Sequence, residues 1–404
     1  MIEKIRNNKI ISISLILFVY LLAFISGYVS YKYIPIENIL LKFFLCDIIG
    51  TIVVYLGGVS LNNASVYDPY WSILPMILVP FFINETIGFN VYTSIIMVFV
   101  EIWGLRLTMN WFLRFKNLKI QDWRYTHIQN KHPKLWPLIS FFGIHILPTI
   151  VVFMGLLPVF AYVDAFEKKV EINGTYFISC IVCFIAIVIE MLADAQMNTF
   201  KKNPENVGKI NRNGLWKKSR HPNYFGEILF WFSMFLFNLS VRSDLWILIF
   251  CPLIIFLLFI SVSIPMLEKR QANNKVGYLE YKKETNIFCV ATFSVALLNI
   301  VLNIIFLDRY FNDTRELFQD SGLNYGHVAL CNSLIILGIS TLLIWGCDNY
   351  LKVLKWSVYI MLAFQLAEIV VEFSFLNTIL NIREFWYVIM AQLSRQKFDV
   401  FIMN

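Results

Sequence analysis

Residues 10–28 read IISISLILFVYLLAFISGY, an apolar run without a charged side chain. A helix of about 20 mostly apolar residues crosses the roughly 30 Å of hydrocarbon in a bilayer. Lys4, Arg6 and Lys9 precede the run, and a basic segment before an apolar one is also typical of a secretory signal peptide. This run is long for a signal peptide and no small-x-small cleavage pattern follows it. We therefore expect it to remain as a membrane anchor.

The composition of the whole chain extends this expectation. Of its 404 residues, 58% are apolar and 15% are charged, whereas soluble globular proteins have about 45–50% and about 25%. This excludes a soluble cytosolic enzyme and a disordered chain, and it predicts an all-α, polytopic bundle of transmembrane helices. The 37 Phe and 19 Tyr suit lipid-facing helices with aromatic interfacial belts. We expect membrane lipids as partners and no nucleic acid, although the net charge is +7.

Further apolar runs predict about 11 spans (10–12) in total. Seven more precede residue 288, at 39–59, 71–83, 91–112, 137–163, 176–192, 225–239 and 245–264. The run 71–83 is short and contains Pro75 and Pro80, which favours a kinked or re-entrant helix. Later runs lie at 288–307, 329–345 and 356–376, with a short one at 385–393. We divide the chain into N-terminal helices (1–65), a membrane core (66–288) and a C-terminal extension of unknown role (289–404).

Basic residues gather in alternate loops. The N-terminus and the segments 114–134, 201–220 and 269–283 are rich in Lys and Arg, whereas the loops between them are poor in both. Loops rich in Lys and Arg stay on the cytoplasmic side of a membrane. Counting spans from a cytoplasmic N-terminus places every basic loop on that side, so we expect a multi-pass membrane protein with its N-terminus in the cytoplasm.

Residues 190–227 form the segment that is richest in side chains able to bind a ligand. Trp216, Arg220, His221, Asn223 and Tyr224 lie within nine residues, just before an apolar helix. Arginine supplies a bidentate fork for phosphate, and the N–H groups at a helix N-terminus add positive potential. Trp and Tyr offer flat faces for a ring, and Asn hydrogen-bonds an amide or a ribose. Binding of a dinucleotide needs these features together, so the segment is a candidate cofactor site. The alternative is that it is only a basic loop with aromatic residues at the membrane interface and binds no ligand.

The same segment resembles a known family. Residues 219–227, SRHPNYFGE, are similar to the RHPNYxGE signature of membrane steroid 5α-reductase-like and sterol reductase-like enzymes. Asp194-x-Gln196 followed by Phe200 resembles their DxQ…F segment. Other stretches resemble the subgroup often called DUF1295: DPYW at 68–71, WGLRL at 103–107, DWRY at 122–125, and Glu268 followed by GYLEY at 277–281. The resemblance covers roughly residues 66–288.

Members of this group are membrane-embedded reductases that use NADPH without a Rossmann domain, and no GxGxxG follows an expected strand here. The resemblance therefore implies NADPH as cofactor and a lipophilic small molecule as substrate. By position, Trp216, Asn223 and Tyr224 hold the cofactor, while Arg220 and His221 contact its phosphate or ribose or order the loop. The remaining cofactor-binding positions implied by the match are Asp194, Lys201, Glu227, Glu268 and Tyr281. Met197 replaces a lysine of the sterol reductases, and Tyr278 is an alternative to Tyr281.

Reduction of a C=C bond also needs a proton donor. A tyrosine or a protonated carboxylic acid in an apolar pocket can supply the proton. Our catalytic candidates are Tyr67, Asp68 and Glu101, with Tyr70 as a further possibility. Glu101 lies inside an apolar run, where a carboxylate is a functional hypothesis by default. Alternatively, Glu101 has a purely structural role and forms an ion pair with Arg106 or Arg124.

The leading hypothesis is an NADPH-dependent oxidoreductase that reduces a C=C bond of a steroid- or isoprenoid-like molecule. One alternative is a membrane methyltransferase of the isoprenylcysteine or phospholipid type, which uses S-adenosylmethionine and shares an RHPxY-type segment. Another is a non-catalytic membrane protein with a relict cofactor loop. We expect no metal site, because Cys180-x-x-Cys183 lies inside an apolar run with no second pair.

Overall fold

The computed structural model describes residues 6–166, 172 and 174–287, all within the compact unit 1–288. In this part of the chain every regular element is helical, and the one extended feature is an isolated bridge between Ser219 and Asn286. The predicted all-α class is therefore confirmed for the described residues.

The helices follow the apolar runs of the sequence. The first four long ones are α2 (Lys9–Tyr33), α3 (Ile39–Ser60), α4 (Tyr70–Glu85) and α5 (Val91–Arg114). After the short α6 (Trp123–Lys131) and α7 (Trp136–Leu138) come α8 (Leu147–Ala165), α9 (Thr175–Lys202), the one-turn α10 (Leu215–Lys218) and α11 (Pro222–Leu239). The described part ends with α12 (Phe250–Leu258), α13 (Ile264–Asn274) and α14 (Tyr278–Glu284).

Asparagine side chains begin several of these helices. Asn8, Asn38 and Asn90 cap α2, α3 and α5 by accepting hydrogen bonds from backbone N–H groups of the first turn. At Asn90 the hydroxyl of Thr93 accepts a hydrogen bond in return from the cap's N–H and completes a capping box. Such caps satisfy N–H groups that have no partner within the helix, which fixes the start of each apolar segment.

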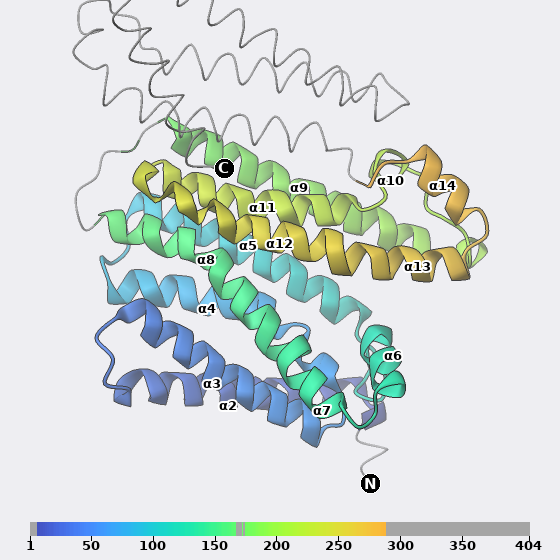
Figure 1. Cartoon of the computed structure of the whole chain (residues 1–404), viewed down its shortest axis with the longest axis horizontal. Helices are drawn as coiled ribbons and strands as arrows, with labels where there is room; N and C mark the ends of the chain where they lie inside the picture. The colour runs from blue at the N-terminus through green and yellow to red at the C-terminus, as the bar shows by residue number, and fades with distance from the viewer. Residues whose placement is uncertain (1–5, 167–171, 173, 288–404) are drawn as a thin grey trace, which may run out of the picture. The chain divides into compact units, whose positions relative to one another are not determined.

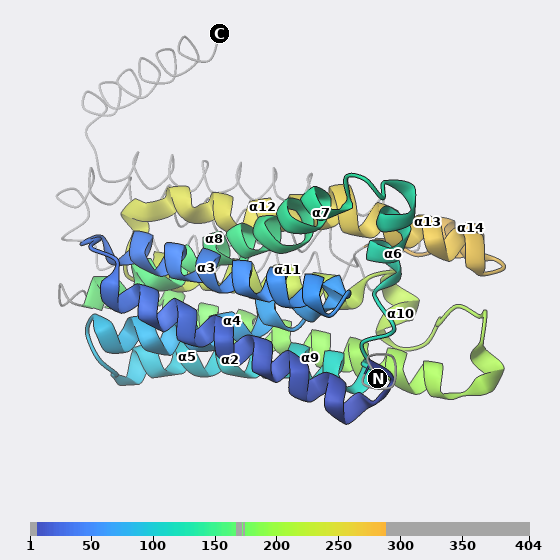
Figure 2. The same ribbon diagram turned by 90° about the horizontal axis from the view of Figure 1, so that it is seen from below.

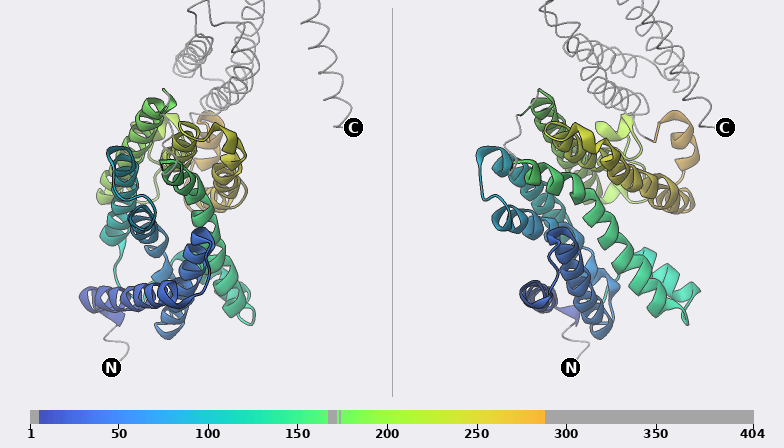
Figure 3. Two further views of the ribbon diagram at one scale, coloured as in Figure 1. Left: turned by 90° about the vertical axis from the view of Figure 1, so that its left-hand side faces the viewer. Right: turned by 60° about the vertical axis from the view of Figure 1, so that its left-hand side comes forward.

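The long helices of this unit lie side by side along one direction (Figure 1). The pair α2 and α3 forms one edge, α9 and α11 lie together toward the opposite edge, and α8 crosses between them. Figure 2 shows this unit from the side of α2 and α3, and the left view of Figure 3 again places these two helices at the opposite edge from α9 and α11. Helices far apart in sequence are therefore neighbours: α8 packs on α4 and α11, and α5 packs on α9.

Seven helical segments among the described residues are long and apolar enough to cross a membrane: 9–33, 39–60, 64–85, 91–114, 136–165, 175–202 and 244–274. They include the expected spans except 225–239, which forms part of α11. Helix α4 continues through Pro75 and Pro80, so the expected short segment belongs to the 22-residue Ala64–Glu85. The total of about 11 spans stays a prediction, because the four runs from residue 288 onward lie outside the described residues.

The outward faces of these helices are apolar. On α2, Leu17, Phe18 and Leu21 each expose more than half of their side-chain surface. Large exposed apolar patches are rare on proteins that face water, whereas lipid is as apolar as these side chains. The chain therefore has the helices and the surface of an integral membrane protein.

The basic segments gather at one end of this unit. Helices α6, α10 and α14 and the end of α13 lie together there, and the described chain also begins there (Figure 1). These elements belong to the basic segments 114–134, 201–220 and 269–283. This agrees with the clustering that the alternating loops predict, while the side of the membrane that this end faces stays a prediction.

Helix α11 is the centre of the bundle, since 14 of its 18 residues are buried. It packs closely on α9 at Gly226, where a Cβ atom would lie 2.3 Å from Cγ of Glu190 and 2.8 Å from the carbonyl oxygen of Ala186. Only a residue without a side chain lets the two backbones approach this closely, as at other small-residue helix contacts in membranes.

Gly226→Ala therefore overpacks the contact between α9 and α11. We expect it to cost about 1–3 kcal/mol and to lower the midpoint of thermal unfolding in detergent by several degrees. The matched control is Gly143→Ala, where the nearest atom to a Cβ is 3.9 Å away, so that the midpoint stays the same or rises. Equal midpoints for the two variants would contradict the close packing at Gly226.

Candidate functional site

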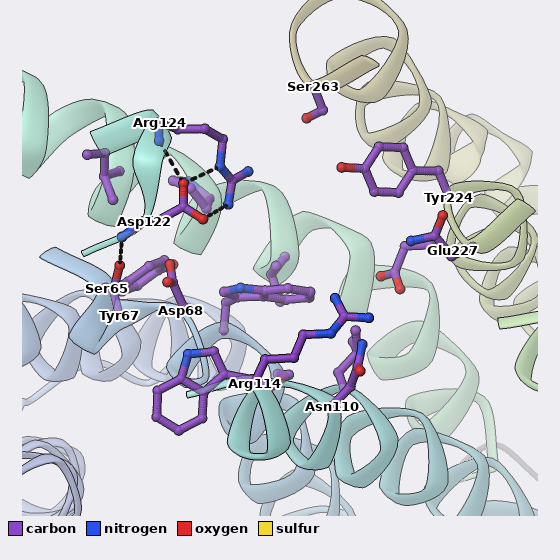
Figure 4. Close-up of a pocket in the computed structure, with 18 of the residues that line it drawn as sticks. Ser65, Tyr67, Asp68, Asn110, Arg114, Asp122, Arg124, Tyr224, Glu227 and Ser263 are labelled. Atoms are coloured by element: carbon purple, nitrogen blue, oxygen red, sulfur yellow. Dashed lines mark hydrogen bonds and ion pairs between the residues drawn. The ribbon is translucent and has the colours of Figure 1, made fainter. Parts of the chain in front are cut away.

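A cavity of about 680 Å³ lies between α4, α5 and α6 on one side and α8, α9, α11 and α12 on the other. Tyr67, Asp68, Asp122 and Arg124 lie on one side of it, and Tyr224 and Glu227 on the other (Figure 4). We call it the first cavity. Its volume falls within the range of about 300–1,000 Å³ that is typical of small-molecule and cofactor sites.

One wall of the first cavity is apolar. It is formed by Ile144, Pro148 and Val151 around the start of α8 and by Ile255 and Leu258 of α12. These side chains offer no hydrogen bond to a ligand. The wall therefore suits the apolar body of a ligand, while the polar groups described next lie on the other walls.

The floor of the cavity holds a cluster of charged residues: Arg106 of α5, Glu190 and Asp194 of α9, and Glu227 of α11. Nη1 of Arg106 donates to Oδ2 of Asp194 at 2.9 Å, and Nη2 pairs with Glu190 and lies 3.7 Å from Oε2 of Glu227. One guanidinium thus connects three helices. We call these four residues the Arg106 cluster.

Neighbouring side chains fix the carboxylates of this cluster. The indole N–H groups of Trp103 and Trp231 donate to the two oxygens of Glu227 at 3.1 and 2.9 Å. The amide of Asn110 donates to Asp194 at 2.8 Å, and Nη2 of Arg114 lies 3.6 Å from Oδ1 of that carboxylate. Each donor stabilises a charge that is costly to bury without partners.

A second polar group lies across the cavity, where α6 meets the start of α4. Nε of Arg124 donates to Asp122 at 2.9 Å, and the backbone N–H of Asp122 donates to Oγ of Ser65 at 2.8 Å. The hydroxyl of Tyr125 donates to Oδ1 of Asp68 at 2.7 Å. Burial, and then the neighbouring Asp68, raise the pKa of Tyr125, so this phenol keeps its proton.

Asn223 and Tyr224 reach the cavity from the first turn of α11. The Tyr224 ring stacks on His221 with centroids 5.6 Å apart and also packs on Phe259 at 4.7 Å. Among the described residues, neither the Asn223 amide nor the Tyr224 hydroxyl has a hydrogen-bond partner. Both polar groups therefore remain available to a ligand.

The residues just before Pro222 have a different environment. Nε of Arg220 donates to Oε1 of Glu268 at 2.7 Å, and its Nη1 donates to the carbonyl oxygens of Lys282 and Thr285. Nε2 of His221 lies 3.3 Å from Oε1 of the same carboxylate. Arg220 and Glu268 are only 7% and 5% exposed, so their hydrogen bonds are made inside the protein.

These contacts hold residues 278–287, which we call the strap. The backbone N–H groups of Arg220 and His221 donate to the carbonyl oxygens of Asn286 and Ile287 at 2.9 and 3.2 Å. The Tyr281 hydroxyl donates to the carbonyl of Trp216, whose indole N–H donates to the carbonyl of Ala193 at 2.9 Å. The strap is thereby tied to the polar loop before α11.

Two pKa shifts follow from this burial. Burial lowers the pKa of His221, although the adjacent Glu268 acts in the opposite direction. His221 is therefore neutral at pH 7. Burial also raises the pKa of Tyr281 to about 12, which keeps its hydroxyl a donor to the loop.

The structure thus separates the predicted cofactor-binding residues into two groups. Asp194, Asn223, Tyr224 and Glu227 line the first cavity. The second group instead joins the loop to the strap or to α9, and it comprises Trp216, Arg220, His221, Glu268 and Tyr281. Lys201 is exposed near the end of α9 and does not line the cavity.

The three proton-donor candidates are also separated. Tyr67 and Asp68 line the first cavity, whereas Glu101 is half-buried on α5 and does not. Arg106 pairs with the carboxylates of its cluster and Arg124 with Asp122, so neither alternative pairing of Glu101 occurs. The catalytic roles of all three stay predictions.

Several polar cavity residues were not predicted by our sequence analysis, and Asn110, Arg114 and Lys116 show why. Asn110 and Arg114 follow Arg106 at intervals of four residues, which places all three on one face of α5, and this polar stripe in an apolar span was a usable signal. Lys116 comes just after the helix and also lines the cavity. It gave no signal beyond the general basicity of its loop.

Comparisons with known proteins identify a family without an assigned activity. The model of the family described as "Protein of unknown function (DUF1295)" matches residues 54–285. An uncharacterized protein of Schizosaccharomyces pombe is 28% identical over 235 residues, which cover 52% of this chain and 66% of the relative. The match thus spans slightly less than two thirds of that relative. No solved structure matches the chain.

The buried contacts of Arg220 predict that it holds the strap. Removing one partner of a buried ion pair costs about 3–5 kcal/mol, so Arg220→Gln should speed hydrogen exchange of the backbone amides in residues 278–287 at least tenfold. The matched control is Arg212→Gln, because Arg212 pairs with Glu284 on the surface with 47% and 60% of the two side chains exposed. Such pairs contribute little, and an equal effect of both variants would refute the role of Arg220.

Proposed function

The chain belongs to the DUF1295 family, and we propose that it is a membrane-embedded, NADPH-dependent reductase of a C=C bond in a lipophilic, steroid- or isoprenoid-like substrate. The observation that carries the proposal is the composition of the first cavity. It joins free polar groups and basic side chains to an apolar wall, within a bundle of membrane-type helices. A charged cofactor and an apolar reactant need both kinds of surface in one place.

The residues of the cavity fit a phosphorylated dinucleotide. Asn223 offers a free amide of the kind that pairs with a carboxamide or a ribose, and Tyr224 offers a ring face. The Arg114 side chain is 46% exposed, and Lys116 lines the same cavity. Both are suited to bind phosphate. When bound, NADPH supplies the hydride for the reduction.

The residues of the loop before α11 support this site indirectly. Since Arg220 and His221 already bind Glu268, we assign them to ordering the loop, one of the two roles that the resemblance allows. Their contacts position Pro222 and hence the first turn of α11, which carries Asn223 and Tyr224. In this interpretation the strap is part of the scaffold of the cofactor site.

The proton of the reduction is assigned to Tyr67. Tyr67 lines the cavity, and its hydroxyl contacts Oγ1 of Thr149 at 2.8 Å. Tyr125 is less suited, because its hydroxyl already donates to Asp68. Tyr67 would donate to the polarised carbonyl or to the second carbon of the double bond, while the apolar wall excludes water.

Binding measurements on the detergent-purified protein test the cofactor. We expect NADPH to bind with a Kd in the micromolar range or tighter, and the double variant Asn223→Ala/Tyr224→Ala to lose this binding. Asn273→Ala/Tyr33→Ala is the matched control, since both residues are exposed and lie outside the first cavity. Binding of S-adenosylmethionine alone would instead favour the methyltransferase, and binding of neither would favour a relict cofactor loop.

Turnover tests the proton donor. Oxidation of NADPH is followed by absorbance with progesterone, a steroid that contains a conjugated enone, as the probe. Tyr67→Phe should lower kcat by about 100-fold or more, in line with general acid catalysis, and leave the Kd for NADPH unchanged. Tyr55→Phe is the control, because its hydroxyl only donates to the carbonyl of Pro137. An unchanged kcat in Tyr67→Phe would exclude Tyr67 as the donor.

A further inference from the structure

A second cavity lies beside the first, between α2, α3 and α4. Its volume is about 490 Å³, and its walls are largely aromatic, with Tyr20, Phe24, Tyr28 and Phe81 among them. Asp47 of α3 is the one carboxyl group on these walls. It is 3% exposed.

Asp47 has little to stabilise a negative charge. Its recorded hydrogen bond comes from the hydroxyl of Thr51, one turn later on α3, at 3.5 Å. Within the described part of the chain no cation forms an ion pair with it. Burial of an ionised carboxylate without such a partner is costly, so a neutral carboxylic acid is the favoured form, and a carboxyl group inside a membrane span indicates function.

Hydroxyl groups connect Asp47 to the first cavity. Oγ1 of Thr51 lies 2.9 Å from Oγ1 of Thr149 on α8, and this atom lies 2.8 Å from the hydroxyl of Tyr67. The Thr149 hydroxyl donates to the carbonyl oxygen of His145 at 2.9 Å, so it must rotate away from this carbonyl to pass a proton to Tyr67. Tyr67, Thr149, Thr51 and Asp47 are each at most 3% exposed. The chain of four groups therefore runs through the protein interior, with Tyr67 on the first cavity and Asp47 on the second.

We propose that Asp47 is a proton store for the active site and that Thr51 and Thr149 relay its proton to Tyr67. The proposal rests on the proposed reductase for its chemistry. It makes Asp47 a positioning and proton-supplying residue that acts through Tyr67 without touching the substrate.

The transfer balances in protons and charge. As the substrate takes hydride from the cofactor, the O–H bond of Tyr67 breaks and its proton goes to the substrate. The resulting phenolate takes the proton of Thr149, Thr149 takes that of Thr51, and Thr51 takes that of Asp47, which becomes a carboxylate. After product release, a hydronium ion from the solvent enters the first cavity and gives up one proton, which passes through the same groups in reverse to the Asp47 carboxylate. The water molecule that remains returns to the solvent.

The relay has an electrostatic advantage for the active site. Without it, the negative charge would stay on Tyr67, next to Asp68 on the same cavity. Like charges close together in a medium of low dielectric repel strongly. Moving the charge to the far end of the hydroxyl chain separates it from Asp68 and from the reacting atoms. A buried carboxylate is costly, but a carboxyl group is a much stronger acid than a phenol, so Asp47 holds the charge at lower cost than Tyr67 does.

Infrared spectroscopy of the purified protein tests the proton store without turnover. The difference spectrum between wild type and Asp47→Asn should contain a carboxylic-acid C=O band, and Thr51→Val should shift this band. Thr51→Ser keeps the hydroxyl and should leave the band in place. If the difference spectrum contains carboxylate bands and no carboxylic-acid band, the proposal is overturned, whatever the activity.

Turnover of progesterone tests the relay itself. Asp47→Asn, Thr51→Val and Thr149→Val should each lower kcat at least tenfold with KM changed less than twofold, and Thr149→Ser should restore most of the kcat lost in Thr149→Val. The double variant Thr51→Val/Thr149→Val should have a kcat no lower than that of Thr149→Val, because both substitutions interrupt the same proton relay. Ser179→Ala is the control for the loss of a buried hydroxyl, as its Oγ only donates to its own helix.

The two proposals fail in different ways. Wild-type protein that has the Asp47 band but neither binds NADPH nor reduces the probe would refute the reductase and leave the stored proton standing. Wild-type protein that reduces the probe, with full kcat in Asp47→Asn and Thr51→Val, would refute the relay and leave the reductase standing. Thermal unfolding of each variant identifies any that has lost its fold.

Discussion

The arrangement of the described helices depends on the need to pair charge inside an apolar bundle. Arg106 meets this need by binding carboxylates from α9 and α11, and the indoles of Trp103 and Trp231 complete the shell of Glu227. A charged side chain in such surroundings can occupy few positions, because the loss of any partner leaves a buried charge without compensation. The cluster therefore sets how α5, α9 and α11 face one another, and its carboxylates form the floor of the first cavity.

The most distinctive motif of the sequence has two structural roles that divide at Pro222. Before the proline, Arg220 and His221 contact Glu268 and the strap. After it, Asn223 and Tyr224 line the first cavity. The proline suits the first turn of a helix, where its missing N–H costs nothing. A loop held by buried ion pairs can thus present free polar groups at a defined position, which is the preorganisation that binding a large, flexible cofactor requires.

The sequence was sufficient to predict the class of fold and most helix positions. An uninterrupted apolar run of about 20 residues has few stable structures other than a helix that crosses a membrane. The run 225–239 also corresponds to a helix, α11 (Pro222–Leu239), but this helix carries Glu227 and Asn238 and is not among the seven segments that are long and apolar enough to cross a membrane. Motif spacing predicted Asn223 and Tyr224 as cofactor-binding residues, and both line the first cavity, but it left Arg220 open between contacting the cofactor and ordering the loop. Spacing cannot reveal that Arg220 already pairs with Glu268 and donates to carbonyl groups more than 60 residues away.

Asp47 shows most clearly what lies beyond motif analysis. It stands before residue 54, where the family match begins. The rule that singled out Glu101, a carboxyl group inside an apolar run, applies to Asp47 as well, but the sequence does not show which groups surround it. Its importance arises only when α3 packs against α8 and brings Thr51 to Thr149. The family segment alone would end the hydroxyl chain at Thr149. In this protein α3 extends that chain to a carboxyl group, and under the proposed relay α3 supports the site together with the helices that carry the family's signature.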